Sequence, residues 1–219
     1  MDIVVQKFGG TSVATNDLRV KVANKVIEKK SSGKFPVVVV SAIGRNGDPY
    51  ATDTLLRLSQ GIYPEITSRE LDLLMSCGET ISAVLMANTI KSMGYDAVAM
   101  TGFQAGITTN SNFGKAEVIN VDPAKIINHL KEDKIVIVTG FQGMSGDGDI
   151  TTLGRGGSDT SAAILGEALK AEVVEIYTDV DGVMTADPRL VSEANVIDSL
   201  CYEEVYQMAR SGAKVIHPK

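Results

Sequence analysis

The chain has 219 residues, of which 44% are hydrophobic and 22% are charged, and its formal net charge is −6. This length suits one large α/β domain or two small ones, and the composition is ordinary for a globular protein. The acidic balance argues against a general binder of nucleic acid or of acidic membranes, so an anionic ligand would need locally placed cations.

Short apolar runs alternate with segments of helical periodicity along almost the whole chain. In chain order we predict strand 3–8, a helix around 18–26 that ends at 31–33, strand 35–42, loop 45–51, a short helix from 54, helix 67–90, strands 96–101 and 117–121, helix 122–130, strand 135–138, a helix after 157, and strand 173–177. Such alternation predicts a mainly parallel sheet between helices. No repeat or Pro-rich linker interrupts it, so we expect one domain.

Local signals mark the ends of several elements. The four consecutive valines within 35–42 are too apolar for a half-exposed strand and are typical of a buried parallel one. Thr67 with Glu70 predicts a capping box at the start of a helix. Asp122 and Pro123 predict an N-cap followed by the first helical residue.

The N-terminus shows no signal peptide, and no apolar run approaches membrane-spanning length. The two cysteines cannot form a disulfide framework. Two histidines without carboxylate spacing predict no transition-metal site. We therefore expect a cytoplasmic protein that binds neither membrane nor nucleic acid.

The stretch 151–161 is the most informative part of the chain, because three glycines surround Arg155 just before an apolar helical run. Glycines let the backbone approach a ligand closely, and the N–H groups that begin a helix favour an anion. Arg155 adds a planar fork of donors for carboxylate or phosphate. The alternative is that Ser158 or Asp159 is only an N-cap, although a cap needs neither the glycines nor Arg155.

Polar and glycine residues also follow several predicted strands, where ligands bind in open parallel sheets: 7–12, 41–44, 140–143 and 178–181. No Walker A motif occurs, and Asp159 stands where a dinucleotide fingerprint needs its third glycine. Lys7, directly before Gly9-Gly10, is placed to reach a phosphoryl group. The alternative is a solvated lysine at a strand end.

Five motifs together resemble the aspartokinases, a group of the amino-acid kinase family. They occur in the expected order and cover the chain from end to end: KFGGTSV at 7–13, GRGGSDTS at 154–161, TDVDGV at 178–183, DPR at 187–189 and GAKVIHP at 212–218. The loop 45–54 is most similar to aspartokinases of Gram-positive bacteria. The resemblance implies a three-layer αβα sandwich on which ATP phosphorylates the side-chain carboxylate of L-aspartate, the first step toward lysine, threonine, methionine and diaminopimelate.

The resemblance also implies roles for individual residues. Lys7 would stabilise the transferring phosphoryl group and Asp159 would orient the lysines. Arg155 would pair with the α-carboxylate of aspartate and Glu79 with its α-amino group. The rest of the aspartate pocket would be lined by Ser41, Thr52, Phe141 and Ser158. The nucleotide would be held by Gly9, Gly10, Ser12, Thr178, Asp179, Met184, Arg189 and Lys214, with Mg²⁺ carried by ATP.

Elementary chemistry agrees with this reaction. A side-chain carboxylate is already ionised at neutral pH, so the site must supply cations and N–H donors rather than a general base. Glu79 could instead be an ordinary surface glutamate of a helix. A kinase for another small acid, such as N-acetylglutamate, and a catalytically silent ATP-binding module remain competing readings. The resemblance implies that regulatory domains would follow Lys219, so we expect 1–219 to be a catalytic domain without them, with a homodimer as a candidate assembly.

Overall fold

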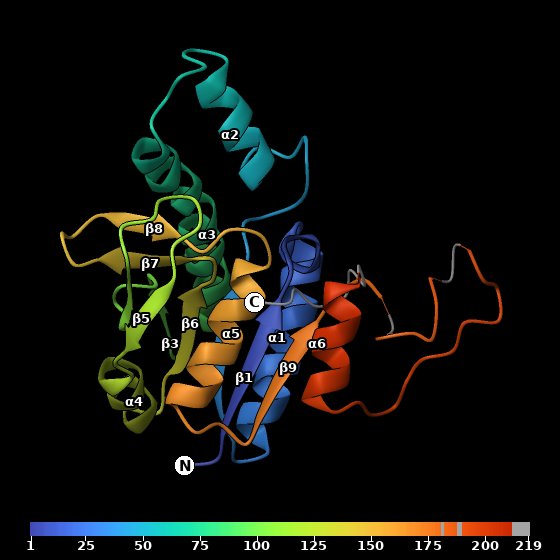
Figure 1. Ribbon diagram of the computed structural model, residues 1–219. Coiled ribbons are helices and arrows are strands. Elements are labelled where there is room, and N and C mark those ends of the chain that lie inside the picture. Colours follow the sequence, from blue (N-terminus) through green and yellow to red (C-terminus); the bar gives the residue numbers. More distant parts are fainter. Residues whose placement is uncertain (181, 188–189, 212–219) are drawn as a thin grey trace. The chain divides into compact units, whose positions relative to one another are not determined.

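The computed structural model describes residues 1–180, 182–187 and 190–211 (Figure 1). The chain divides into two compact units, Met1–Tyr177 and Thr178–Lys219. Within the described part of the smaller unit, a single β-bridge joins Met184 to Val196, and helix α6 (Tyr202–Arg210) follows. Every other helix and strand described below lies in the larger unit.

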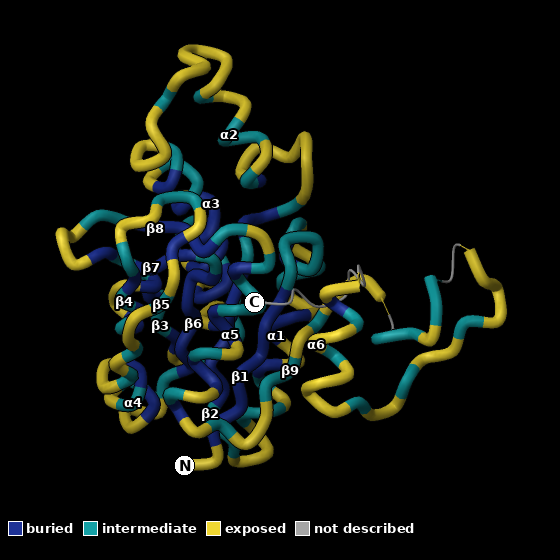
Figure 2. Tube along the Cα trace, viewed as in Figure 1, coloured by how far each residue is buried: buried dark blue, intermediate teal, exposed yellow. Residues whose placement is uncertain are grey.

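A five-stranded parallel sheet forms the centre of the larger unit, in the order β3-β6-β2-β1-β9. Its strands are β1 (Ile3–Phe8), β2 (Phe35–Val40), β3 (Ala97–Met100), β6 (Ile135–Thr139) and β9 (Val173–Tyr177). The valines of β2 are completely buried, as the apolar run predicts (Figure 2). The predicted mainly parallel sheet between helices is confirmed.

Successive residues of a strand point to opposite faces of the sheet, so the buried valines of β2 make both faces apolar. A layer of helices covers each face. Val38 and Val40 face a core formed with α1 (Asn16–Ser31) and α3 (Ser68–Ser92). Val37 and Val39 face a core formed with α4 (Ala124–Lys131) and α5 (Gly157–Ala168). The result is the three-layer αβα arrangement (Figure 1).

A second, four-stranded sheet has the order β5-β4-β7-β8, and only β5 was predicted. Its strands are β4 (Ile107–Thr109), β5 (Val118–Val121), β7 (Gln142–Ser145) and β8 (Ile150–Thr152). The β4–β5 and β7–β8 pairs are antiparallel, whereas β4 and β7 run parallel. Short helices η1 (Gly10–Val13) and α2 (Thr52–Gln60) complete the unit.

Two predicted helix starts differ in detail. Thr67 is the N-cap of α3, but its side chain makes no capping hydrogen bond, so the predicted capping box is absent. Pro123 occupies the N-cap position of α4 rather than its first helical position. Asp122 still acts as a cap, because its Oδ1 accepts a hydrogen bond of 3.0 Å from Ala124 N.

Helix α3 is long and apolar enough to cross a membrane by length and composition alone, contrary to the expectation that no run approaches that length. Its buried face, however, contacts the strands β3, β6 and β8 of both sheets. That face also carries two buried carboxylates, Asp72 and Glu79. The helix therefore has the character of a core helix in a globular domain.

Candidate functional site

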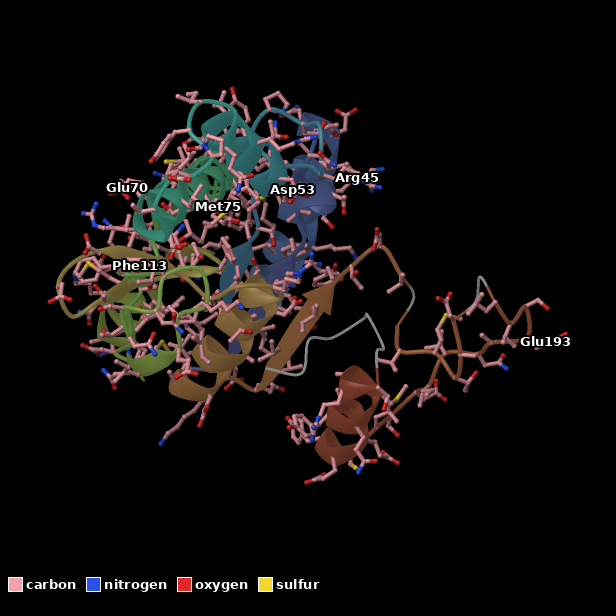
Figure 3. The ribbon with its side chains drawn as sticks, turned by 45° about the horizontal axis from the view of Figure 1, so that its top comes forward. Arg45, Asp53, Glu70, Met75, Phe113 and Glu193 are labelled. Carbon is pink, nitrogen blue, oxygen red and sulfur yellow. The ribbon has the colours of Figure 1, made fainter. Side chains whose placement is uncertain are left out.

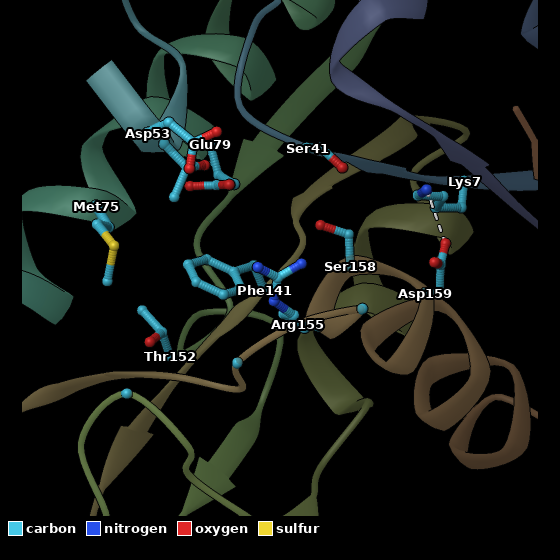
Figure 4. A pocket seen from close by; sticks show the side chains of 15 residues that line it. Lys7, Ser41, Asp53, Met75, Glu79, Phe141, Thr152, Arg155, Ser158 and Asp159 are labelled. Atoms are coloured by element: carbon cyan, nitrogen blue, oxygen red, sulfur yellow. Dashed lines mark ion pairs between the residues drawn. The ribbon is translucent and has the colours of Figure 1, made fainter. Parts of the chain in front are cut away.

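The carboxyl ends of β1, β2 and β6 lie side by side, since these strands are neighbours in a parallel sheet. Hydrogen bonds continue past the strand ends, from Ser41 N to Phe8 O at 3.2 Å and from Gly140 N to Val40 O at 2.9 Å. The segments that the sequence predicts for a ligand after these strands thus come together. A pocket of about 480 Å³ opens there (Figure 4).

The pocket is lined by every side chain that the sequence predicts for catalysis and for the acid substrate. These are Lys7, Ser41, Thr52, Glu79, Phe141, Arg155, Ser158 and Asp159. They come from β1, α2, α3, α5 and the connecting segments, and they are separated by up to 152 positions in the sequence (159 − 7). The pocket contains two cations, Lys7 and Arg155, although the chain as a whole is acidic.

Lys7 lies in β1 and forms an ion pair with Asp159, with 2.7 Å between Nζ and Oδ1 (Figure 4). Its side chain is only 11% exposed, which excludes the alternative of a solvated lysine at a strand end. The partner carboxylate projects from the first turn of α5. Because the Lys7 ammonium has three donors, two remain for a ligand while Asp159 fixes its direction.

Helix α5 begins with the glycine turn that the sequence singles out. Its N-cap is Gly156, whose φ of 71° lies in the left-handed region that favours glycine. Ser158 and Asp159 consequently occupy the first helical turn and are not the N-cap. A Cβ on Gly157 would lie 2.7 Å from Cδ2 of Phe141, so this glycine allows the ring to contact the helix start.

Phe141 has a φ of 70°, which is strained for a residue with a side chain. Two hydrogen bonds hold this backbone in place. Phe141 N donates to Ser161 Oγ at 3.0 Å, and Phe141 O accepts from Leu153 N at 2.9 Å. The bonds tie Phe141 to Leu153, where the loop that carries Arg155 begins, and to Ser161 in α5, the helix that follows this loop. Phe141 and Arg155 both line the pocket (Figure 4).

Glu79 is buried in α3 with 2% of its surface exposed, which excludes the alternative of an ordinary surface glutamate. Its Oε1 accepts a hydrogen bond of 3.1 Å from Ala42 N, while its buried Oε2 has no partner in the described part of the chain. Burial raises the pKa of this carboxyl group to about 7. A cationic ligand group in the pocket would supply the missing partner and favour ionised Glu79.

The residues predicted for the nucleotide are distributed differently. Gly9 lies between β1 and η1, and Gly10 and Ser12 lie in η1 itself. A Cβ on Gly10 would lie 2.2 Å from Ala42 O, so only glycine allows these two strand ends to approach so closely. Thr178, Asp179 and Met184 belong to the smaller unit, and Arg189 and Lys214 lie outside the described residues.

Sequence reasoning assigned no role to four further residues of the pocket wall: Asp53, Met75, Gly114 and Thr152. Asp53 and Met75 come from α2 and α3, which pack against each other (Figure 3). Asp53 directly follows the predicted Thr52, and Met75 precedes Glu79 by one helical turn, so helical spacing could have indicated both. Thr152 lies at the start of the informative stretch 151–161. No local signal marks Gly114, which tertiary pairing brings to the pocket.

Comparisons with known proteins agree with this geometry. Residues 2–219 match the model of the amino acid kinase family. The chain is 50% identical over all its 219 residues to aspartokinase 1 of Bacillus subtilis and 48% identical over 217 residues to an aspartokinase of Mycolicibacterium smegmatis. It covers 54% and 50% of those two proteins, so it spans about half the length of the curated relatives that it matches.

Solved structures give the same result. The aspartate kinase of Synechocystis has a TM-score of 0.84 and 41% identity, covering 99% of this chain and 34% of that one. Escherichia coli aspartokinase III in complex with aspartate and ADP has a TM-score of 0.82 and 32% identity, covering 99% and 58%. The resemblance to aspartokinases, including those of Gram-positive bacteria, is thereby confirmed.

Proposed function

The chain belongs to the amino acid kinase family, and we propose that it carries the site at which ATP phosphorylates the side-chain carboxylate of L-aspartate. The observation that supports this most is one pocket that holds the Lys7–Asp159 ion pair together with Arg155 and buried Glu79. A relative of the same fold binds both aspartate and ADP.

Aspartate carries two carboxylates and one ammonium group, and the pocket offers a complement to each. Arg155 can bind the α-carboxylate through its planar fork of donors. The unpartnered Oε2 of Glu79 can accept a hydrogen bond from the α-ammonium group. The side-chain carboxylate would then face Lys7, which lies at the other end of the pocket (Figure 4).

Phosphoryl transfer to a carboxylate requires neutralisation of charge on the transferring group more than it requires a base. We assign this task to the ammonium group of Lys7, which Asp159 holds in place at 2.7 Å. The Gly9-Gly10 turn would bring backbone N–H groups to the phosphate oxygens, since only Phe8 separates it from Lys7. Mg²⁺ would arrive with ATP, held mainly by phosphate oxygens and water.

N-acetylglutamate is the competing substrate class, because it is also a small dicarboxylic acid. Its acetylated nitrogen carries no positive charge, so it offers nothing to compensate ionised Glu79 in its buried position. The burial of Glu79 therefore favours a substrate with a free amino group. A silent nucleotide-binding module would need neither a buried carboxylate nor Arg155 in the pocket.

Trapping of the acyl phosphate with hydroxylamine tests the proposal. With ATP and Mg²⁺, aspartate should give hydroxamate and N-acetylglutamate should give none. Lys7→Ala should lower the rate of hydroxamate formation by about 10²–10³-fold, whereas Lys21→Ala, a change at an exposed lysine of α1, should preserve it. If only N-acetylglutamate gives hydroxamate, then N-acetylglutamate and not aspartate is the substrate. If neither acid gives hydroxamate, the chain is a silent nucleotide-binding module.

A further inference from the structure

Asp72 is a buried carboxylate of α3 that does not line the pocket, yet within the described residues its side chain accepts hydrogen bonds only from the pocket wall. Its Oδ2 accepts from Gly114 N at 2.9 Å and from Thr152 N at 2.8 Å. Its Oδ1 accepts from Thr152 Oγ1, also at 2.8 Å. Both donor residues belong to the pocket wall.

The two donor residues belong to segments far apart in the sequence. Gly114 lies in the loop 110–117 between β4 and β5, and Thr152 is the last residue of β8. A hydrogen bond of 2.9 Å from Ala116 N to Thr152 O joins the segments directly. The Asp72 side chain and this backbone hydrogen bond therefore both connect the loop 110–117 to the end of β8.

Thr152 is also the start of the loop that carries Arg155, three residues further on. The next residue, Leu153, donates its N–H to Phe141 O, and Gly157 N closes the loop by donating to Gly154 O at 3.0 Å. The side chain of Arg155 is exposed to the pocket. Its position hence depends on how firmly the loop is held at Thr152.

Burying a carboxylate is costly unless hydrogen bonds compensate it. Asp72 is fully buried, and no cation lies within ion-pair distance of it in the described ranges. Three donors at 2.8–2.9 Å supply the compensation. Removing the carboxylate would leave two backbone N–H groups and one hydroxyl group without an acceptor.

Fastening α3 to the second sheet does not by itself require Asp72. Ser76 lies one helical turn after Asp72 in α3. Its carbonyl oxygen accepts a hydrogen bond of 3.0 Å from Gln142 Nε2, which links α3 to β7. Gln142 also lies opposite Thr152 in the β7–β8 pair. What Asp72 adds is an acceptor for the N–H and hydroxyl groups of Thr152 and a contact with the loop 110–117 through Gly114.

The geometry points to Asp72 as a positioning residue that fixes Gly114 and Thr152 and, through Thr152, sets Arg155 for the α-carboxylate of the substrate. The identity of that substrate rests on the proposed function, whereas the effect on the two wall segments does not. Asp72 acts through these residues and touches no reacting atom.

Two substitutions at Asp72 separate geometry from charge. Asp72→Ala removes all three acceptor contacts, so we expect the aspartate KM to rise about 10-fold or more. The kcat and the ATP KM should change less than threefold. Asp72→Asn keeps an oxygen for the two N–H donors and offers an NH₂ group to the Thr152 hydroxyl, so its aspartate KM should stay within about threefold of the wild type.

The matched control is Ser82→Ala, which truncates another fully buried polar residue of α3 that makes no hydrogen bond to the pocket wall. An unchanged aspartate KM in Asp72→Ala would overturn the inference, as would an equal rise of both substrate KM values. A defect in Asp72→Asn as large as in Asp72→Ala would also contradict it. If Asp72→Ala does not fold, Thr152→Val removes one contact and should raise the aspartate KM about two- to fivefold, and no change would refute positioning.

Hydrogen–deuterium exchange provides a readout that does not depend on the substrate. In Asp72→Ala, amide exchange should become about 10-fold faster in segments 110–117 and 152–157, and in Asp72→Asn and Ser82→Ala it should match the wild type. Exchange that accelerates in the first segment only would refute the link to Arg155. If the wild-type chain does not phosphorylate aspartate, the proposed function fails, and this experiment still decides the role of Asp72.

Discussion

Replacing Glu79 by glutamine should stabilise the ligand-free chain at pH 8 much more than at pH 5. Burial raises the pKa of this carboxyl group from 4.5 to about 7 in the folded state, while the unfolded chain keeps the ordinary value. The protonated form is therefore favoured by folding. Its contribution to stability is fully present below pH 4.5 and is lost as the pH rises through 7.

The expected size follows from the two pKa values. Their difference corresponds to about 3 kcal/mol in total, of which about 2.5 kcal/mol is lost between pH 5 and pH 8. Glutamine does not titrate, so the variant escapes this loss. The free energy of unfolding of the variant minus that of the wild type should increase by about 2 to 3 kcal/mol over this pH range.

Urea unfolding followed by circular dichroism at pH 5 and pH 8 measures this difference. Glu70→Gln removes the same charge at an exposed position of α3 and serves as the control for net charge. A Glu79→Gln effect that is equal at both pH values, or larger at pH 5, would show that Glu79 is not desolvated in the folded chain.

The remaining predictions concern kinetics. If ionised Glu79 binds the ammonium group of aspartate, the aspartate KM should be about tenfold higher at pH 6 than at pH 8 in steady-state assays, and this dependence should vanish in Glu79→Gln. Lys7→Ala should lower kcat by about 10²–10³ with little change in either KM, because the lost donor acts mainly on the transition state; a kcat within a few-fold of the wild type would remove Lys7 from catalysis. Arg155→Ala should raise the aspartate KM and leave the ATP KM unchanged, and weakened ATP binding with an unchanged aspartate KM would assign Arg155 to phosphate.

The central sheet was predictable because its strands are mostly apolar runs, of which the valines of β2 are the clearest. The second sheet was not, because β4 and β8 are three-residue segments, each Ile-Thr-Thr, flanked by glycine or polar residues. Such short segments carry no periodicity of their own. Pairing with β7 makes both of them strands, and β8 also contacts α3.

The candidate site was likewise predictable from the sequence only in part. Glycine-rich motifs and strand ends led to Lys7, Arg155 and Asp159, since those residues lie in segments with unusual local composition. Asp72 gave no such signal, because a single acidic residue in a helix usually faces solvent. It lies seven positions before Glu79 and so on the same face of α3, but only the folded chain shows that this face is buried.

The order of the central strands has a consequence for the synthesis of the chain. β1 pairs with β2 on one side and with β9 on the other, and 137 residues separate the ends of these two partners (177 − 40). At about 5–20 residues per second, a ribosome needs roughly 7 to 27 s to add that length. During this interval one edge of β1 has no native partner and could pair with another nascent chain. Because Asp159 lies 152 positions after Lys7 (159 − 7), their ion pair cannot form before residue 159 has left the ribosome.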